Sequence, residues 1–181
     1  MRAFIFPGQG SQAVGMGKAL AEASAVAREV FQEVDDALGQ CLFKLMCEGP
    51  EADLTLTENA QPAIMANAIA TLRVLEREGG VKLSEKASFV AGHSLGEYTA
   101  LCAAGAFDLA TTAKLLKLRG QAMQAAVPVG IGAMAALLGP AGNRVVVRRA
   151  ERVQELPARA VEHDAPADLA RQDHGFALHS I

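Results

Sequence analysis

Apolar side chains recur every three or four residues in two long segments of the chain. Residues 18–38 and residues 59–78 both show this spacing, which is the pattern of a helix with one buried face. Gly39 follows the first segment, where a glycine commonly ends a helix. Asn59 begins the second segment, where its side chain can accept a backbone hydrogen bond as an N-cap. The pattern predicts two amphipathic helices.

Shorter apolar runs predict strands between and after these helices. Residues 3–6 form the first run, which Pro7-Gly8 ends and which feeds a glycine-rich loop reaching about Gly17. The elements expected after the second helix are a strand (88–91), a tight turn (92–96), a helix (97–104), a helix capped by Asp108 that continues to about residue 123, and a strand (132–138). Strands that alternate with helices indicate an α/β fold with a parallel sheet.

The composition is that of a globular chain of about one domain. Of its 181 residues 51% are hydrophobic and 20% are charged, which excludes disorder of the whole chain. The chain has 17 Lys and Arg and 20 Asp and Glu, which gives a formal net charge of −3. The chain therefore lacks the positive charge that binds nucleic acid or an anionic membrane. Nothing at the N-terminus resembles a signal peptide, so we expect a cytoplasmic protein.

The cysteines do not suggest a metal centre. Cys41, Cys47 and Cys102 are odd in number and lack the paired spacing of a zinc site or a disulfide framework. We expect reduced thiols and predict neither a metal nor a cofactor.

The pentapeptide Gly92-His93-Ser94-Leu95-Gly96 lies between the second predicted strand and a predicted helix. A G-x-S-x-G sequence in that position is typical of a nucleophile elbow, in which the serine hydroxyl stands exposed on a sharp turn. We predict Ser94 as the nucleophile and the amide of Leu95 as an oxyanion donor. The alternative is a turn that only links two elements. A packing role is predicted for His93, because it cannot easily swing back to its neighbour's hydroxyl.

The loop after the first strand, Gly8-Gln9-Gly10-Ser11-Gln12-Ala13, fits the G-x-G-x-x-A pattern of a dinucleotide-binding turn. That reading needs an acidic residue after a second strand, whereas Asp35 and Asp36 close a predicted helix. A Walker loop is also disfavoured, because Ala19 follows Lys18 where a hydroxyl is needed. We therefore predict that the backbone amides of this loop bind an oxyanion or a phosphate.

Four segments stand in the order and spacing of one known family. They are Phe6-Pro7-Gly8-Gln9-Gly10-Ser11-Gln12, Gly92-His93-Ser94-Leu95-Gly96-Glu97, Arg119-Gly120-Gln121-Ala122-Met123-Gln124 and Gly132-Ala133-Met134-Ala135-Ala136. Over about residues 1–139 the chain resembles the malonyl-CoA:acyl-carrier-protein transacylases of type II fatty acid synthesis. The resemblance implies an α/β-hydrolase-like large subdomain, here partial, over residues 1–131. It also implies the first strand of a ferredoxin-like small subdomain over residues 132–139.

The chemistry implied by the resemblance is a ping-pong transfer. Ser94 would take malonyl from malonyl-CoA and pass it to the phosphopantetheine thiol of acyl carrier protein. Arg119 would bind the malonyl carboxylate and select malonyl over acetyl, because a guanidinium matches a carboxylate in geometry and charge. The backbone amides of Gln12 and Leu95 would form the oxyanion hole. A monomer without cofactor or metal is implied.

The family activates its serine with a histidine far downstream, in a Phe-His-Ser or similar context, and its members are longer than this chain. Residues 140–181 continue no segment of the family and hold six of the eleven arginines. We hypothesise a shift of reading frame near codon 139, against the alternative of a genuine divergent segment. His163 and His174 are expected to be exposed, and His179-Ser180 is a weak candidate for the missing histidine motif. We therefore expect weak activity or none.

Two other functions stay open at this point. The elbow is shared with α/β-hydrolases, so a serine esterase or thioesterase is one alternative. The other is a non-catalytic fragment that binds CoA or carrier protein.

Overall fold

The computed structural model describes residues 2–127, 135–137, 144–146 and 176–180. The chain divides into one unit of residues 1–121 and 174–181 and another of residues 122–173. The second unit contains an antiparallel pair of strands, β3 (Ala135–Leu137) and β4 (Arg144–Val146). The strand expected over residues 132–138 is thus confirmed in its described part. The subdomain boundaries at 131 and 139 stay predictions.

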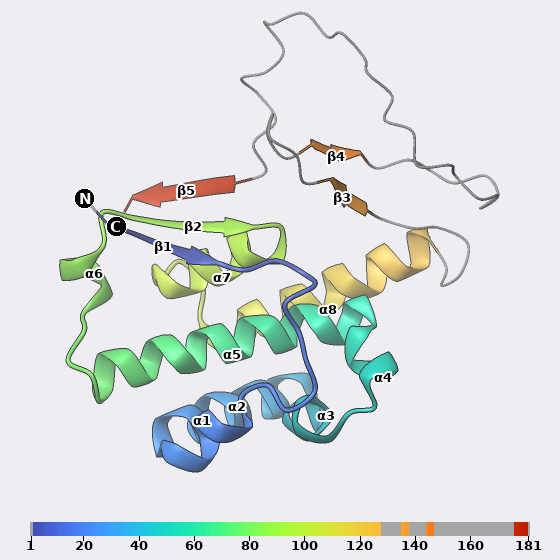
Figure 1. The fold of residues 1–181 in the computed structure, drawn as a ribbon, viewed down its shortest axis with the longest axis horizontal. Helices are drawn as coiled ribbons and strands as arrows, with labels where there is room; N and C mark the ends of the chain where they lie inside the picture. Colours follow the sequence, from blue (N-terminus) through green and yellow to red (C-terminus); the bar gives the residue numbers. More distant parts are fainter. Residues whose placement is uncertain (1, 128–134, 138–143, 147–175, 181) are drawn as a thin grey trace, which may run out of the picture. The chain divides into compact units, whose positions relative to one another are not determined.

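The first unit is built on a three-stranded sheet in the order β1-β2-β5 (Figure 1). Strands β1 (Ala3–Phe6) and β2 (Phe89–His93) are parallel, with Phe6 opposite Gly92. This register brings the carboxyl ends of both strands to the same edge of the sheet. The α/β class and the parallel pairing are therefore confirmed.

Strand β5 (Phe176–Ser180) pairs with β2 in the antiparallel direction. The sheet is consequently mixed, where the alternation of strands and helices predicted a parallel one. His179, the weak candidate for the histidine motif, lies within β5, although no strand was predicted there. Short apolar runs near a chain end carry little periodic signal, so the pattern did not reveal this pairing.

The helices of the described chain are α1 (Lys18–Ala23), α2 (Ala25–Leu38), α3 (Leu42–Glu48), α4 (Glu51–Thr55), α5 (Thr57–Arg77), α6 (Leu83–Lys86), α7 (Leu95–Ala103) and α8 (Leu109–Ala126). Helix α5 crosses the middle of the first unit, with α2 against one side and α7 against the other (Figure 1). Helix α7 also packs on β1 and β2. The main core lies between these helices and includes Phe31, Met65, Leu95 and Leu116, each at most 2% exposed.

The helix predicted over residues 18–38 is interrupted at Ser24. This residue has extended backbone angles, φ −130° and ψ 129°, and its Oγ accepts the Ala27 N–H at 3.2 Å. Ser24 therefore ends α1 and caps α2. The spacing of apolar residues did not reveal the break, because the buried residues of α1 and α2 follow one another at nearly continuous helical spacing. Gly39 ends α2 at φ 60°, as predicted.

Asn59 is not the N-cap of α5, which begins two residues earlier at Thr57. The Asn59 side chain is buried, donates to the Asp53 carbonyl at 2.9 Å and accepts from Lys117 Nζ at 3.0 Å. The cap prediction for Asp108 is confirmed, because its Oδ1 accepts the Thr111 N–H at 2.6 Å. Helices α3, α4 and α6 are too short for periodicity to predict them.

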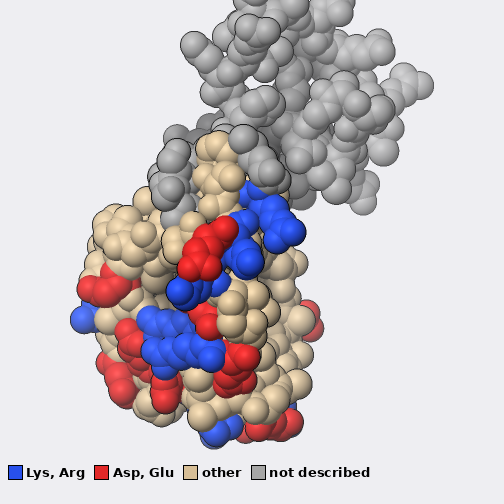
Figure 2. All heavy atoms as spheres, turned by 90° about the vertical axis from the view of Figure 1, so that its left-hand side faces the viewer, with Lys and Arg blue, Asp and Glu red and all other residues tan. Residues whose placement is uncertain are grey.

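Positive and negative side chains alternate on the face shown in Figure 2, over the C-terminal end of α5 and neighbouring helices. Arg73 pairs with Glu33 at 3.1 Å and Arg77 with Glu29 at 3.0 Å. No helix in the described part of the chain combines the length and apolarity needed to cross a bilayer.

Candidate active site

Ser94 forms a one-residue corner between β2 and α7. The turn was expected over residues 92–96. In the structure it is shorter, because β2 continues to His93 and α7 begins at Leu95. Ser94 has φ 56° and ψ −113°, and among the described residues it is the single non-glycine with a positive φ. Such a conformation costs about 1–3 kcal/mol and persists where the surroundings enforce it. This is the strained geometry of a nucleophile elbow.

The two glycines of the elbow are required by close backbone contacts. A Cβ on Gly92 would overlap the carbonyl group of Gly96, and a Cβ on Gly96 would overlap the Phe6 carbonyl oxygen. The first contact lets α7 turn back directly on β2, and the second lets it pass over the end of β1. The G-x-S-x-G spacing is therefore a steric requirement of this corner, which disfavours a simple linking turn.

Arg119 reaches the elbow from α8, 25 residues further along the chain. Its Nη2 donates to Ser94 Oγ at 3.2 Å, and its Nη1 donates to Gln61 Oε1 at 2.7 Å. Its Cζ lies 5.8 Å from the centre of the Tyr98 ring, within the range of a cation–π contact. The structure thus brings together Ser94, which the elbow motif predicts as the nucleophile, and Arg119, to which the family resemblance assigns the carboxylate.

Gly120 permits the close approach of α8 that places Arg119 here. A Cβ at this position would lie 2.5 Å from Glu58 Cα and 2.7 Å from the Thr57 carbonyl oxygen. Any larger residue would push α8 away from the start of α5. The glycine that follows Arg119 is therefore part of the site.

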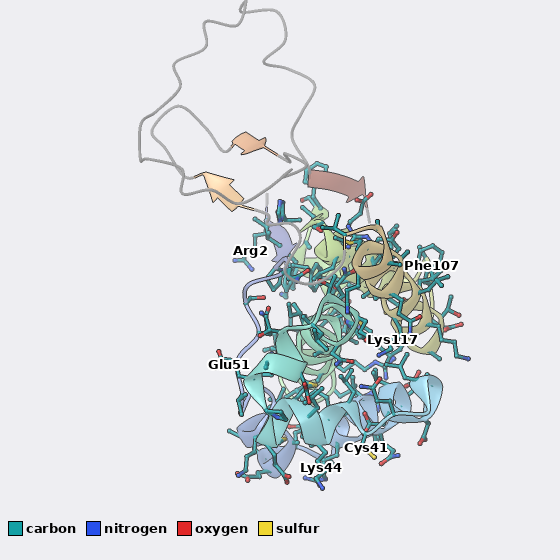
Figure 3. The ribbon with its side chains drawn as sticks, turned by 90° about the vertical axis from the view of Figure 1, so that its right-hand side faces the viewer. Arg2, Cys41, Lys44, Glu51, Phe107 and Lys117 are labelled. Atoms are coloured by element: carbon teal, nitrogen blue, oxygen red, sulfur yellow. The ribbon has the colours of Figure 1, made fainter. Side chains whose placement is uncertain are left out.

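Lys117 fixes the same helix through a polar cluster that the sequence analysis missed. Its Nζ lies 3.0 Å from Glu58 Oε2 and donates to Gln40 Oε1 at 2.9 Å and to Asn59 Oδ1 at 3.0 Å. Lys117 thereby lies between α8 and the α2–α3 end of the unit (Figure 3). The hydrogen bond from Lys117 lowers the pKa of Glu58. These partners lie far apart in sequence, so local pattern gave no signal for them.

The loop after β1 lies against the elbow. A Cβ on Gly8 would lie 2.6 Å from His93 Nδ1, so the exposed imidazole packs on the loop backbone, in line with the packing role predicted for His93. The Gln12 side chain turns back within the loop, where its Oε1 accepts the Gly10 N–H at 2.8 Å. Gln9, which sequence analysis did not single out, directly follows Gly8 and donates from Nε2 to Thr57 Oγ1 at 3.3 Å.

Leu95 is the first residue of α7 and is fully buried. The N–H groups of a helix's first turn have no acceptor within the helix, and the helix dipole makes them favourable sites for negative charge. The amide of Leu95 directly follows the Ser94 hydroxyl in the chain. This is the position at which the motif predicts an oxyanion donor.

The structure describes the backbone position of one candidate histidine, His179. In the pairing of β2 with β5, His179 stands opposite Val90 and Phe176 opposite His93. The backbone of His179 is therefore paired three residues, or about 10 Å, before the end of β2 at His93. His163 and His174 lie outside the described residues. Among the described residues, His, Cys, Asp and Glu form no group of three or more that could hold a metal ion.

Comparison with known proteins identifies the family of this fold and site. The acyl transferase domain family matches residues 3–156. The malonyl CoA-acyl carrier protein transacylase of Escherichia coli K12 is 38% identical over 176 residues, which is 97% of this chain and 56% of that protein. The protein of the same name from Bacillus subtilis 168 is 49% identical over 137 residues, or 76% of this chain and 42% of that protein.

A solved structure gives the same answer. The acyl-carrier-protein-S-malonyltransferase of Bartonella henselae is 61% identical, with a TM-score of 0.72 over 77% of this chain and 44% of that one. The chain spans about half the length of the curated relatives it matches. The resemblance drawn from the four sequence segments is thus confirmed, and the chain belongs to the acyl transferase domain family.

Proposed function

We propose that Ser94 is the malonyl-accepting nucleophile of a malonyl-CoA:acyl-carrier-protein transferase and that Arg119 binds the malonyl carboxylate. The observation that carries the proposal is the 3.2 Å hydrogen bond from Arg119 Nη2 to Ser94 Oγ. A guanidinium beside a nucleophilic hydroxyl suits an acyl group that carries its own carboxylate. The names of the relatives, malonyl CoA-acyl carrier protein transacylase, support the same substrates.

In the first half of the reaction, Ser94 Oγ attacks the thioester carbonyl carbon of malonyl-CoA. A C–O bond forms, the C–S bond breaks, and the hydroxyl proton leaves with the CoA thiol. The negative charge that develops on the carbonyl oxygen is stabilised by the amide of Leu95 and by a second amide from the loop after β1. Losing one such donor typically lowers the rate by ~10²–10³.

Gln12 is the predicted source of the second amide. The contact between Gly8 and His93 also brings the start of the loop to the elbow, so the amide of Gln9 is a further candidate. Because backbone N–H groups act here, their side chains matter mainly through the shape of the loop.

The second half of the reaction reverses the first with a different thiol. The phosphopantetheine thiol of acyl carrier protein attacks the malonyl-serine ester, and malonyl leaves as the new thioester while Ser94 regains its proton. The proton transfers need a base, which the family resemblance assigns to a downstream histidine. His93 packs on the first loop, so we propose that another histidine supplies the base. No cofactor or metal enters these steps, and a monomer in the cytoplasm stays a prediction.

The test is to follow the fate of the malonyl group. The chain is incubated with malonyl-CoA and an acyl carrier protein that bears phosphopantetheine, and the carrier is examined by intact-mass spectrometry. A transferase yields malonylated carrier, and the Ser94→Ala chain yields none. Release of free malonate without loading of the carrier would instead support the esterase alternative. Absence of both products with malonyl-CoA bound would support a non-catalytic binding fragment.

A further inference from the structure

We infer that Gln61 is a positioning residue that orients the Arg119 guanidinium toward the acyl site. This inference deepens the proposed function and rests on it. Gln61 lies in α5 and Arg119 in α8, 58 residues later, and Arg119 Nη1 donates to Gln61 Oε1 at 2.7 Å.

The surroundings of Gln61 explain why its amide is constrained. The residue is 0% exposed and lies among buried apolar residues of α5, such as Ala63, Ile64 and Met65. A buried amide is costly unless its polar atoms find partners. Arginine has only donors, so the amide must present its oxygen to Arg119. The orientation of the Gln61 amide is therefore set by this contact.

The bond to Gln61 in turn sets the direction of the rest of the guanidinium. This group is planar, so fixing Nη1 restricts the plane in which Nη2 can lie. In the structure Nη2 reaches Ser94 Oγ at 3.2 Å, and the Tyr98 ring lies 5.8 Å from Cζ. The same nitrogen is thus aimed at the place where the acyl group is bound to Ser94. Gln61 acts through Arg119 and does not itself need to touch the substrate.

The neutrality of Gln61 is as important as its oxygen. A glutamate has nearly the same shape, but its charge would pair with Arg119 and compete with the substrate carboxylate. A methionine has a similar length but cannot accept the guanidinium hydrogen bond strongly. If Gln61 only fills space, methionine should leave the preference for malonyl-CoA unchanged. If Gln61 positions Arg119, methionine should lower that preference, and glutamate should lower it further by pairing with the guanidinium.

The experiment measures equilibrium binding by titration calorimetry, so it does not require turnover. The Ser94→Ala chain is titrated with malonyl-CoA and with acetyl-CoA, and the ratio of the two affinities reports the carboxylate contact. Gln61→Met and Gln61→Glu are then introduced into the same chain. Gln121→Met is the matched control, because Gln121 lies on the exposed side of α8 and donates to Glu58 at 3.3 Å instead of contacting Arg119.

We expect Gln61→Met to lower the preference for malonyl-CoA about threefold to tenfold, the range of one hydrogen bond. Gln61→Glu should lower it more than Gln61→Met, while acetyl-CoA affinity and the Gln121→Met control stay within about twofold. An unchanged ratio, or an equal fall for both ligands, would overturn the positioning role. If Gln61→Met does not fold, Gln61→Asn takes its place, because the shorter neutral side chain withdraws the carbonyl oxygen from Arg119 Nη1, and the same fall in the malonyl-CoA preference is expected. A parent chain that shows no preference for malonyl-CoA would overturn the proposed carboxylate site as well.

Discussion

Arg119 Nη2, on α8, donates a hydrogen bond across 3.2 Å to Ser94 Oγ, at the corner between β2 and α7. Ser94 is held there by the clash-limited corner between β2 and α7, and Arg119 by the approach of α8 to α5 at Gly120. Under the proposed function, the pair joins the attacking atom of an acyl transfer to the group that recognises the malonyl carboxylate. The packing of α7 on β2 and of α8 on α5 holds the two residues at this distance.

Replacing Arg119 should remove selectivity for the carboxylate. A charge-assisted hydrogen bond contributes about 1.5–3 kcal/mol, so Arg119→Ala should weaken malonyl-CoA binding by ~10–150-fold. Acetyl-CoA binding should change little, because its methyl group makes no such bond. The malonyl-CoA affinity of Arg119→Lys should lie between those of the parent chain and Arg119→Ala, since lysine keeps the charge but loses the planar pair of donors. Binding of both CoA thioesters to the Ser94→Ala chain measures this, and an equal loss for both would contradict it.

A side chain at Gly92 should disrupt the elbow. The Cβ of Gly92→Ala would overlap the Gly96 carbonyl group, and relief requires movement of the backbone around Ser94. We expect unfolding to become easier by more than the ~1–3 kcal/mol of ordinary overpacking.

Gly105→Ala is the control for this change. Gly105 has φ +78° with nothing within 4 Å of its Cβ position, so it tests only the conformational cost, about 1–2 kcal/mol. Thermal denaturation followed by circular dichroism compares the two variants. Equal melting temperatures would show that the elbow tolerates the side chain.

The Glu58–Lys117 pair should make stability depend on pH. Lys117 lowers the pKa of Glu58, so the folded chain holds the proton less tightly than the unfolded chain. The stabilisation is therefore present above the ordinary glutamate pKa and is lost as the pH falls through the lower pKa of the folded state. Both side chains are about one-quarter exposed, at 21% and 27%, so the pair should contribute about 1 kcal/mol at pH 7.

Urea denaturation of Glu58→Gln measures this contribution. The variant should be less stable than the parent chain at pH 7, and the difference should shrink toward about pH 3. Glu85→Gln provides the control, because its pair with Lys82 is more than half exposed, at 59% and 71%, and should contribute at most about 0.5 kcal/mol. A Glu58→Gln difference that does not change with pH would contradict the assignment.

Ser24→Ala should destabilise the junction of α1 and α2. The substitution removes the cap on the Ala27 N–H and the 2.6 Å hydrogen bond that Ser24 Oγ donates to Glu78. Loss of a serine cap costs about 1 kcal/mol, and the buried position of Ser24, 3% exposed, should place the effect at or above that value. Ser84→Ala, at an exposed position in α6, should change stability by less than about 0.5 kcal/mol. Equal denaturation midpoints for the two variants would refute the capping role.

The parts of the fold that the sequence predicted correctly depend on local sterics. The elbow is the clearest case, because Gly92 and Gly96 are required by contacts within a few residues of Ser94 and by the end of the adjacent strand. Strand β1 and the Asp108 cap are equally local. The role expected for Arg119 came instead from the family resemblance, since nothing in the spacing of α8 points to a partner 25 residues away.

The features that were missed are those that depend on tertiary contacts. Ser24 interrupts the helix within a continuous apolar pattern, because its hydroxyl accepts the Ala27 N–H of α2 and donates to Glu78. Gln61 looks like an out-of-place polar residue in a buried helix until Arg119 is seen beside it. Lys117 likewise becomes informative only when Glu58, Gln40 and Asn59 are brought around it. A polar residue within an apolar helical segment was the sequence signal that could have indicated the buried Gln61 contact.

The most direct test of the account is the acylation of Ser94 itself. The chain is incubated separately with malonyl-CoA and acetyl-CoA, with imidazole added as an external base, and the adduct is located by peptide mass spectrometry. We expect one malonyl group on Ser94, slower labelling by acetyl-CoA, and no adduct at this position in the Ser94→Ala chain. Labelling that avoids Ser94, or that proceeds equally with both thioesters, would contradict it.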